Sequence, residues 1–598
     1  MVAPPLQRQL SQRVDAAPSP LPPCTWSAAL PNKYIQNCAS LPPGPKCRNF
    51  TTLSQAISDC DADLGCGGVT SQGAGAAPWE TRAGPAALDS PNGEVSYAIT
   101  NLDECHPPAP VVPDAVWKAR GAAAYAGVAR TDPEAVWSFQ GWAIIYWTRE
   151  DQASAFRGFV DAVPPGKFVV VDMSEDGCGG WYTPPPHRRA AAPFPYTCKG
   201  EWSKFGDASF FGAPFLWTAL HDFGGTDGLK GALGRAAELP FAGLASAGGA
   251  NTSVFGSGFT PEGIDQNPVF YELLLSNAFR AAPEANVTDW AISRAHRRYN
   301  LSHPSADVTE AWSLLAGANY AGFGTGVWDA TGVPHIPATA TQFEGNRRTP
   351  APALCATWGA WGALLSAASA AAVPPGVLSE PLCYDLVNTG REVLAQVAAP
   401  VSMNFSDAVG ANLLDGAMLS VTGQAYLDLL ADVDELAATD EAFLLGPWLA
   451  AARGLAAAGD DEDCAISSPA DPLPCADFYE WNARAQLTTW KPCLEEACLV
   501  SKDRYTPTDY AAKHWSGLIS GYYRPRVEQM LLQALEDAAG GRPLDRGAVD
   551  VRWSKLAFDF QRDFGNMGPL APVGDAIEVS ARMRAKYGAW FAGCGGTD

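Results

Sequence analysis

Two glutamates lie in similar short turns, each just after a segment with the composition of a β-strand. Glu262 lies between a proline and a glycine in GFTPEGIDQN, which follows TSVFGSG and leads into the helical segment NPVFYELLLSNAF. Glu104 lies in YAITNLDECHPP, at the end of the strand-like EVSYAITNL. Two carboxyl groups that face one cleft can act as a proton donor and as a nucleophile or base.

The pair alone is a weak signal, because the chain has 64 acidic residues and some pair would always fit. The simpler reading of Glu262 is an acid in the turn before a helix, where its charge interacts favourably with the helix dipole. A pair of carboxyl groups across a cleft is also what glycoside hydrolysis requires. The elements that would position the pair therefore decide between these interpretations.

Residues from about 94 to 282 alternate between strand and helix patterns. The strand-like segments are EVSYAITNL, AVWSFQGWAII, KFVVVDM, APFLWTALHDFGG and TSVFGSG, and the helical ones between them are PDAVWKARGAAAYAGVA, REDQASAFRGFVDAV and LKGALGRAAEL. This alternation predicts right-handed β–α–β units around a parallel sheet. In a barrel of such units the carboxyl ends of the strands form one face, so Glu104 and Glu262 would share it.

The fold class expected is α/β plus all-α. Residues 88–282 are expected to form an incomplete (β/α)8 TIM-like barrel, and residues 283–598, where helical patterns dominate, a large all-α domain. Residues 1–23 are rich in Pro and Ala and are expected to be disordered. Residues 24–87 are expected to form a small Cys-rich module, loosely similar to apple-like modules, in which TLSQAISDCDADLGCGGVT predicts a short helix and a turn tied by cysteines.

The composition argues against several classes of protein. A net charge of −23 argues against nucleic acid as a partner, because binding of phosphates needs a basic patch. We read no membrane span from the hydropathy. The cysteines lack zinc-site spacing, so we expect no metal and no cofactor. The 20 tryptophans are a weak indication of a sugar-binding cleft.

Fifteen cysteines and five N-glycosylation sequons favour an oxidising compartment, which means a lysosomal or secreted protein. The sequon asparagines are Asn49, Asn251, Asn286, Asn300 and Asn404. The first residues, MVAPPLQRQLSQRV, show no signal peptide, and we expect the true start of the protein to lie upstream.

Seven segments together resemble the α-N-acetylglucosaminidases of glycoside hydrolase family 89. They are YAITNLDECHPP, FQGWAII, VVVDM, PFLWTALHDFGGTDGL, GSGFTPEGIDQNPVFYELL, ARAQLTTW and PTDYAAKHWSGLISGYYRPR, and the resemblance runs from about residue 94 to the C-terminus. It implies hydrolysis of terminal α-linked N-acetylglucosamine with retention, by two glutamates on a (β/α)8 barrel that packs against a helical domain. The implied partner is a glycan with terminal α-linked N-acetylglucosamine, and a homo-oligomer is left open.

The resemblance also implies roles for individual residues. Glu104 resembles the general acid/base and Glu262 the nucleophile. The residues implied in substrate binding are Asp103, Trp142, Leu220, His221, Trp490 and Tyr510. His514 lies in a loop that resembles a pocket edge, whereas His296 and His303 are expected to be surface or packing residues.

The chemistry of an α-glucosaminide favours a separate nucleophile, because the acetamido and leaving groups lie on the same ring face and the acetamide cannot attack from behind. Retention would then need the carboxyl groups of Glu104 and Glu262 about 5–5.5 Å apart. Glu104 should stay protonated, with its pKa raised by a charged Asp103. Asp103-Glu104 also looks like the pair of acetamide-assisted β-hexosaminidases, and this alternative stays open.

The sequence departs from the family pattern in four places. Asp103 and Asp222 stand where the family usually has asparagine, and residues 174–208 form an insertion with Cys178 and Cys198. Three further barrel strands are expected before Glu104, and residues 1–93 do not resemble them. The alternative to an active enzyme is therefore a catalytically inactive carbohydrate-binding protein, or a truncated product of such an enzyme.

Overall fold

The computed structural model describes most of the chain in two compact units, residues 1–113 and 114–598, which we treat separately. The described residues are 23–35, 49–62, 66–71, 78–82, 87–89, 94–101, 114–141, 150–172, 209–219, 221, 228–246, 254–259, 267–301, 303–321, 351–371, 379–410, 415–457, 473–490, 509 and 511–594.

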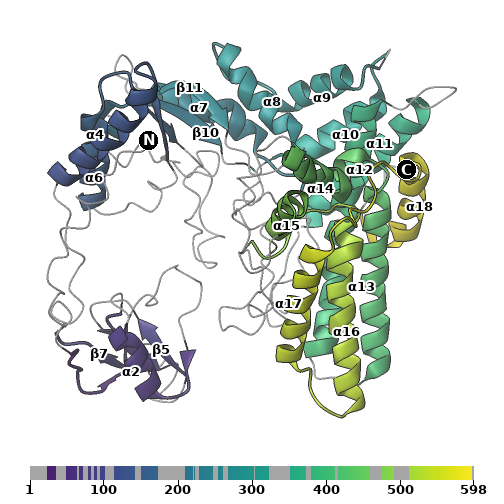
Figure 1. Ribbon diagram of the computed structural model, residues 1–598. Coiled ribbons are helices and arrows are strands. Elements are labelled where there is room, and N and C mark those ends of the chain that lie inside the picture. Colours follow the sequence, from purple (N-terminus) through teal and green to yellow (C-terminus); the bar gives the residue numbers. More distant parts are fainter. Residues whose placement is uncertain are drawn as a thin grey trace. The chain divides into compact units, whose positions relative to one another are not determined.

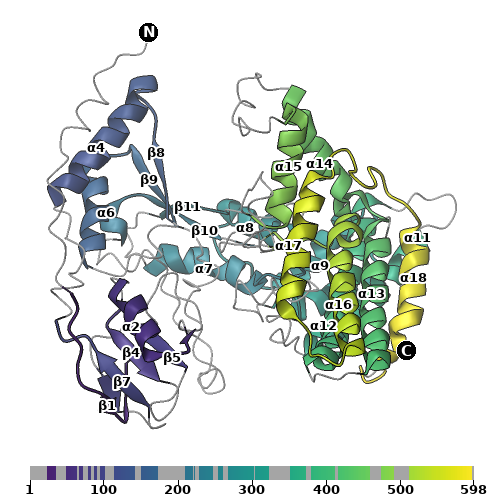
Figure 2. The ribbon, with the colours of Figure 1, turned by 60° about the horizontal axis from the view of Figure 1, so that its bottom comes forward.

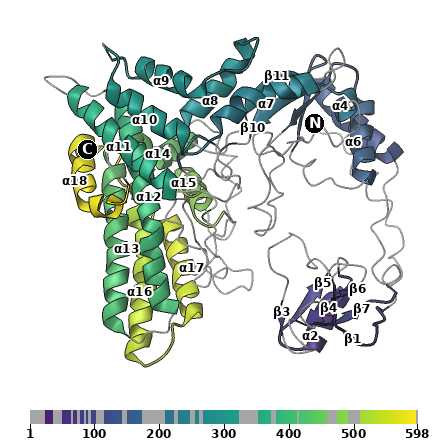
Figure 3. The ribbon, with the colours of Figure 1, turned by 180° about the vertical axis from the view of Figure 1, so that it is seen from behind.

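The described residues of the N-terminal unit form antiparallel strands and the helix α2, as Figure 3 shows. Its five-stranded sheet has the order β1-β7-β4-β5-β3, and β2 pairs with β6. The elements are β1 (Leu30–Pro31), β2 (Lys33–Ile35), β3 (Asn49–Phe50), α2 (Leu53–Ala62), β4 (Gly68–Ser71), β5 (Trp79–Arg82), β6 (Ala87–Asp89) and β7 (Val95–Ala98). A disulfide joins Cys60 in α2 to Cys66, so the predicted helix and cysteine-tied turn are confirmed.

The strand predicted at EVSYAITNL is present as β7, but it lies in a different sheet from the one expected. It pairs antiparallel with β1 and β4, not with the parallel strands that follow. Its flanking residue Ile99 is buried beside Val69, and Tyr97 contacts Trp79 at 5.8 Å between ring centroids. These contacts pack Ile99 and Tyr97 against the apolar core of the N-terminal unit, and β4 pairs with the backbone of β7 there.

The second unit begins with a parallel sheet in the order β11-β10-β9-β8. Its strands are β8 (Trp137–Gln140), β9 (Phe168–Asp172), β10 (Phe215–Ala219) and β11 (Val254–Phe259), and its helices are α4 (Asp114–Thr131), α6 (Glu150–Ala162) and α7 (Leu233–Ser246). All three strand pairs are parallel and follow the chain order. Strands and helices therefore alternate as predicted for this part of the chain, and Figure 2 shows α4 and α6 beside β8 and β9.

An aromatic cluster holds the first strands to their helices. Phe156 of α6 is fully buried against Phe168 of β9 and Phe210, and Phe210 meets Phe215 of β10 edge-on at 5.0 Å. Trp137 of β8 meets Phe168 edge-on at 5.3 Å. Since the strands are parallel and in order, their carboxyl ends point to the same edge, where the predicted site loops begin.

The rest of the unit is helical, as predicted. The helices are α8 (Pro268–Ser276), α9 (Val287–Arg298), α10 (Ala306–Gly317), α11 (Ala351–Ala371), α12 (Glu380–Gly410), α13 (Gly416–Ala437), α14 (Leu445–Gly454), α15 (Cys475–Leu487), α16 (Arg524–Ala539), α17 (Arg546–Arg562) and α18 (Ala576–Tyr587). Figure 1 shows α13, α16 and α17 side by side, and α12 packs against both α11 and α13. One apolar core runs from β10 through these helices to the C-terminal residues.

Helix α12 lies at the centre of this core, and small residues allow its neighbours to approach closely. A Cβ on Gly390 would come within 2.6 Å of Trp361 in α11. A disulfide between Cys355 in α11 and Cys594 closes a span of 239 residues around the domain.

Helix α11 is also the helix within the described residues that is long and apolar enough, by length and composition, to cross a membrane. The stretch is Leu354–Ala371, with a mean hydropathy of 1.2. Trp361, Leu364 and Ala368 of this stretch are fully buried in the helical core.

Candidate functional site

Most of the residues predicted to do chemistry fall outside the described residues. These are Glu104, Glu262, Asp103, Trp142, Leu220 and Tyr510, and also Asp222 and the insertion at 174–208. His221 and Trp490 are described, as are the residues that close the loops on which the others lie. The described part of the candidate site therefore consists of the residues at the ends of those loops.

His221 follows β10, at the carboxyl end of the parallel sheet where the sequence predicted it. Its ring is buried and stacks on Phe270 in the first turn of α8, with 4.2 Å between centroids and an interplanar angle of 18°. Tyr271 meets the same ring edge-on at 5.4 Å. The start of the LHDFGG loop is thus fixed to the helix that follows the Glu262 loop.

Asn267, the last residue of GFTPEGIDQN, ties the end of the Glu262 loop to the end of the LHDFGG loop. Its side-chain amide donates to the Gly228 carbonyl at 3.0 Å, and its Oδ1 accepts from the Lys230 N–H at 3.2 Å and the Tyr320 hydroxyl at 3.0 Å. The residue is 1% exposed and adopts a left-handed backbone with φ of 45°, which asparagine tolerates better than most residues. Sequence analysis assigned Asn267 no role.

Glu392 of α12 binds the backbone between those two contacts. Its Oε2 accepts from the Leu229 N–H at 3.0 Å, and its Oε1 accepts from the Gln396 side chain at 2.7 Å. The side chain is buried, and burial raises its pKa to about 7. The hydrogen bonds from Leu229 and Gln396 and the charges of Lys230 and Arg391 oppose this rise. Glu392 is a second functional candidate that the sequence did not reveal.

Trp490 lies in the turn after α15, and its side chain is half exposed. The turn closes with the Trp490 N–H donating to the Ala485 carbonyl at 2.8 Å, and the residue has a φ of 58°. The N–H of Asp509 donates to the Thr488 carbonyl at 2.8 Å. This bond joins the residue before Tyr510 in the sequence to the turn that contains Trp490.

Buried side chains of neighbouring helices form hydrogen bonds with residues on both sides of this turn. Asp509 accepts from Arg526 at 2.5 Å and from the Tyr522 hydroxyl at 3.2 Å. The side-chain amide of Gln561 donates to the hydroxyls of Thr488 at 2.6 Å and Thr489 at 2.9 Å. The side chains on either side of the turn therefore have partners in α16 and α17.

His514 lies further along the same segment, and its side chain is buried. Its carbonyl accepts from Arg391 of α12 at 2.8 Å. Arg391 also donates to Asn388 at 2.7 Å, and its guanidinium lies 3.6 Å from the centroid of Phe443. The structure thus anchors the His514 segment to the helix that holds Leu229.

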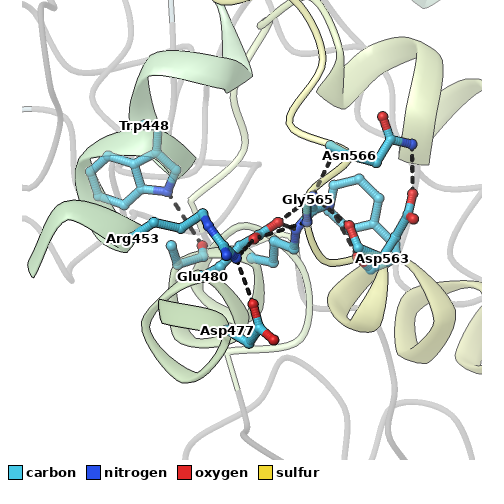
Figure 4. A network of polar contacts seen from close by, with 10 residues as sticks. Trp448, Arg453, Asp477, Glu480, Asp563, Gly565 and Asn566 are labelled. Carbon is cyan, nitrogen blue, oxygen red and sulfur yellow. Dashed lines mark hydrogen bonds and ion pairs between the residues drawn. The ribbon is translucent and has the colours of Figure 1, made fainter. Parts of the chain in front are cut away.

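A buried polar network orients α15, the helix that leads into Trp490 (Figure 4). Glu480, which is fully buried, accepts from Arg453 of α14 at 2.6 Å and from Arg484 at 2.8 Å. Arg453 also binds Asp477 at 2.7 Å. Arg484 donates in addition to the carbonyls of Phe560, Asp563 and Asn566. The network therefore joins α15 to α14 and to the end of α17.

The remaining histidines behave as predicted where they are described. His296 bonds to Ser305 through Nε2 and to the Ile292 carbonyl through Nδ1, at 3.0 Å in each case, so it packs the α9–α10 connection. Within the described ranges, no group of three or more His, Cys, Asp or Glu residues is arranged to hold a metal ion.

Buried side chains hold the described ends of segments that contain predicted site residues. Asn267 joins the ends of the LHDFGG and Glu262 segments, and the adjacent α12 residues Glu392 and Arg391 bind the backbone of Leu229 and His514. Segments that are anchored next to the carboxyl end of a parallel sheet suit chemistry that depends on the placement of carboxyl groups.

Two family models match this chain. The tim-barrel domain model of α-N-acetylglucosaminidase (NAGLU) matches residues 93–281, a range that includes β7, and the C-terminal domain model of the same enzyme matches residues 290–586. Human (Homo sapiens) α-N-acetylglucosaminidase is 30% identical over 507 residues, which are 83% of this chain and 58% of the human protein.

Two solved structures from Clostridium perfringens share the fold. The family 89 glycoside hydrolase in complex with PUGNAc has a TM-score of 0.58 at 20% identity. A family 89 enzyme with two glutamates changed to glutamine, in complex with its substrate GlcNAc-α-1,4-galactose, has a TM-score of 0.56 at 19% identity. Each comparison covers 79% of this chain and 46% of the bacterial chain.

The chain thus spans about half the length of the bacterial enzymes and somewhat more of the human one. The two family models nevertheless cover most of its residues in the order barrel then helices. The protein belongs to the α-N-acetylglucosaminidase family, glycoside hydrolase family 89.

Proposed function

We propose that this protein is a retaining exo-glycosidase that hydrolyses terminal α-linked N-acetyl-D-glucosamine from glycans. Glu262 attacks the anomeric carbon as the leaving oxygen takes a proton from Glu104. Glu104 then activates the water that releases the sugar. The observation that carries the proposal is the fastening of the Glu262 loop to the LHDFGG loop through Asn267, in a chain of this family.

The two-glutamate assignment has support from a relative. The bacterial enzyme crystallised with its substrate GlcNAc-α-1,4-galactose had two glutamates changed to glutamine. Substitutions of that kind preserve shape and remove the carboxylate that acts as nucleophile or the acid that donates a proton. In this chain Glu104 and Glu262 match the family motifs, while Leu220, His221, Trp142, Trp490, Tyr510 and Asp103 would surround the sugar.

Hydrolysis of an aryl α-N-acetylglucosaminide by the purified chain tests the proposal. Glu262→Gln and Glu104→Gln should each lower kcat by at least about a thousandfold, in line with loss of a nucleophile or acid/base. The exposed Glu435, which pairs with Arg582 at 2.5 Å, supplies the control Glu435→Gln, expected to be unchanged. Proton NMR of the first product should show the α-anomer.

The same assay separates an enzyme from a carbohydrate-binding protein. Binding of N-acetylglucosamine derivatives by the folded chain without turnover would support the inactive alternative. Full activity of either glutamine variant would refute the role given to that glutamate.

We also propose that the protein is lysosomal or secreted. Its disulfides Cys60–Cys66 and Cys355–Cys594 suit an oxidising compartment. Four of the sequon asparagines are exposed, namely Asn49, Asn286, Asn300 and Asn404. A loss of mass on treatment of the native protein with peptide N-glycosidase would support this location, and an unglycosylated, reduced protein would contradict it.

A further inference from the structure

Three successive backbone groups at the end of the LHDFGG loop are bound by side chains from two distant elements. The Asn267 side chain donates to the Gly228 carbonyl and accepts from the Lys230 N–H. Between these two bonds, Glu392 accepts from the Leu229 N–H. The Leu229 carbonyl also accepts from Asn319 at 3.5 Å. This short segment is therefore the junction between the Glu262 loop, the LHDFGG loop and the helical domain.

A glutamate is a costly residue for this junction. Glu392 is 2% exposed in the centre of an apolar core, where a carboxyl group loses its hydration. Both of its oxygens are used, one by Leu229 and the other by Gln396. A leucine would fill the same place in α12 without this cost, but it could not accept the Leu229 N–H. The hydrogen bond with the Leu229 N–H is therefore what a glutamate provides at position 392 and a leucine would not.

We propose that Glu392 is a positioning residue: through the Leu229 N–H it holds residues 228–230, which follow the LHDFGG motif, against Asn267, which follows Glu262 in the sequence. The proposal rests on the function proposed above. Glu392 does not touch the sugar in this scheme. It acts through the loop that begins at His221, whose ring is fixed at the other end by Phe270.

The neighbouring residue has a parallel task. Arg391 holds the His514 carbonyl at 2.8 Å, so one turn of α12 supports two segments that hold predicted pocket residues. Misplacement of such segments by a fraction of an ångström lowers the rate or the affinity of an enzyme even where the reacting groups are intact. A defect at Glu392 should therefore show in catalysis before it shows in folding.

Two substitutions at one position separate placement from simple stability. Glu392→Gln keeps an acceptor oxygen for the Leu229 N–H, whereas Glu392→Ala removes it. Hydrogen exchange of a peptide that covers residues 221–233 reports on the loop directly, and kcat and KM on an aryl α-N-acetylglucosaminide report on the site. Glu435→Gln, an exposed change in α13, is the matched control.

We expect Glu392→Ala to exchange the Leu229 amide at least tenfold faster, with kcat/KM lowered at least tenfold at a temperature well below melting. Glu392→Gln should keep slow exchange and recover most of kcat/KM. Fast exchange in both variants, or slow exchange in both, would overturn the proposal, as would full activity in Glu392→Ala. If the unmodified chain turns over no substrate, the proposed function fails, and the exchange rates alone still decide whether Glu392 holds the loop.

Discussion

Arg391 and Glu392 are consecutive residues of α12, yet they bind two different segments of the candidate site. Arg391 donates to the His514 carbonyl at 2.8 Å, and Glu392 accepts from the Leu229 N–H at 3.0 Å. Neighbours in a helix point about 100° apart, so one turn can face two loops at once. The helical domain thus takes part in building the site, and it is more than a support for the barrel.

The first prediction concerns the pH dependence of stability. Burial raises the pKa of Glu392 to about 7 from 4.5. The folded state therefore holds a proton that the unfolded state has lost between these values. The contribution of Glu392 to the free energy of unfolding is therefore fully present below about pH 4.5. It is lost as the pH rises through about 7, a change on the order of 3 kcal/mol. Glu392→Gln should flatten this part of the profile.

Urea unfolding midpoints at pH 4.5, 5.5, 6.5 and 7.5 measure the effect for both proteins. Asp385 and Asp440 also have pKa values raised by burial, so some slope should remain in the variant. Glu435→Gln should leave the slope as it is. Equal slopes for Glu392→Gln and the unmodified chain would contradict the assigned pKa.

The second prediction concerns Asn267, which combines a left-handed backbone with three side-chain hydrogen bonds. Asn267→Gly keeps the backbone without strain but loses the contacts, at about 1 kcal/mol each. Asn267→Ala loses the contacts and adds about 1–2 kcal/mol of backbone strain. Thermal unfolding should rank the proteins in the order Asn, Gly, Ala.

The order of kcat/KM values should differ from this order of stabilities. Both substitutions free the end of the Glu262 loop, so both should lower kcat/KM by a similar factor of at least about ten, while only their melting temperatures differ. A glycine variant with the full activity of the unmodified chain would show that Asn267 serves the fold alone.

The sequence predicted the parallel strands well, because local pattern carries that information. KFVVVDM contains the apolar run FVVV and becomes β9, and the alternation of elements predicts the order β8 to β11. The same pattern makes EVSYAITNL a strand but cannot name its partner. Its hydrogen bonds go to β1 and β4, and that choice depends on tertiary packing around Ile99.

The contacts at the candidate site could not be predicted from the sequence, because they too depend on tertiary packing. Asn267 before a proline predicts the start of a helix, but its partners Gly228 and Lys230 lie 39 and 37 residues away. Glu392 is one acid in a long helical segment, and its partner Leu229 lies 163 residues away. Nothing local distinguishes either residue from ordinary helix positions.

The third prediction concerns Glu480 in the network of Figure 4. Glu480→Gln leaves the guanidinium of Arg484, which is 1% exposed, without its carboxylate partner. Breaking a buried pair from one side costs about 3–5 kcal/mol. The matched control is Asp559→Asn, which breaks the exposed pair with Lys555 and should cost less than about 1 kcal/mol.

Shifts of the urea midpoint, followed by tryptophan fluorescence, compare the two variants. A cost for Glu480→Gln no larger than that for Asp559→Asn would mean that Asp477, as the partner of Arg453, and the carbonyl partners of Arg484 suffice without the carboxylate.

The last prediction concerns Trp490, whose stability and function should respond in opposite directions. A bulky residue with a φ of 58° is strained, and such strain is found most often at functional sites. The side chain is 50% exposed beside the segment that leads to Tyr510. An exposed indole face can pack against a sugar ring, which the proposed substrate provides. Trp490→Gly should relieve the strain and leave the melting temperature unchanged or higher.

The same variant should raise KM about tenfold, which corresponds to about 1.4 kcal/mol of lost binding, with a smaller effect on kcat. Trp590, which is 49% exposed and outside the candidate site, gives the control Trp590→Gly, expected to leave KM unchanged. A lower melting temperature with normal KM for Trp490→Gly would place the tryptophan in the fold and remove it from the sugar site. A higher KM without loss of stability is explained by direct contact with substrate, because the backbone of the turn is held independently by Thr488, Asp509 and Gln561.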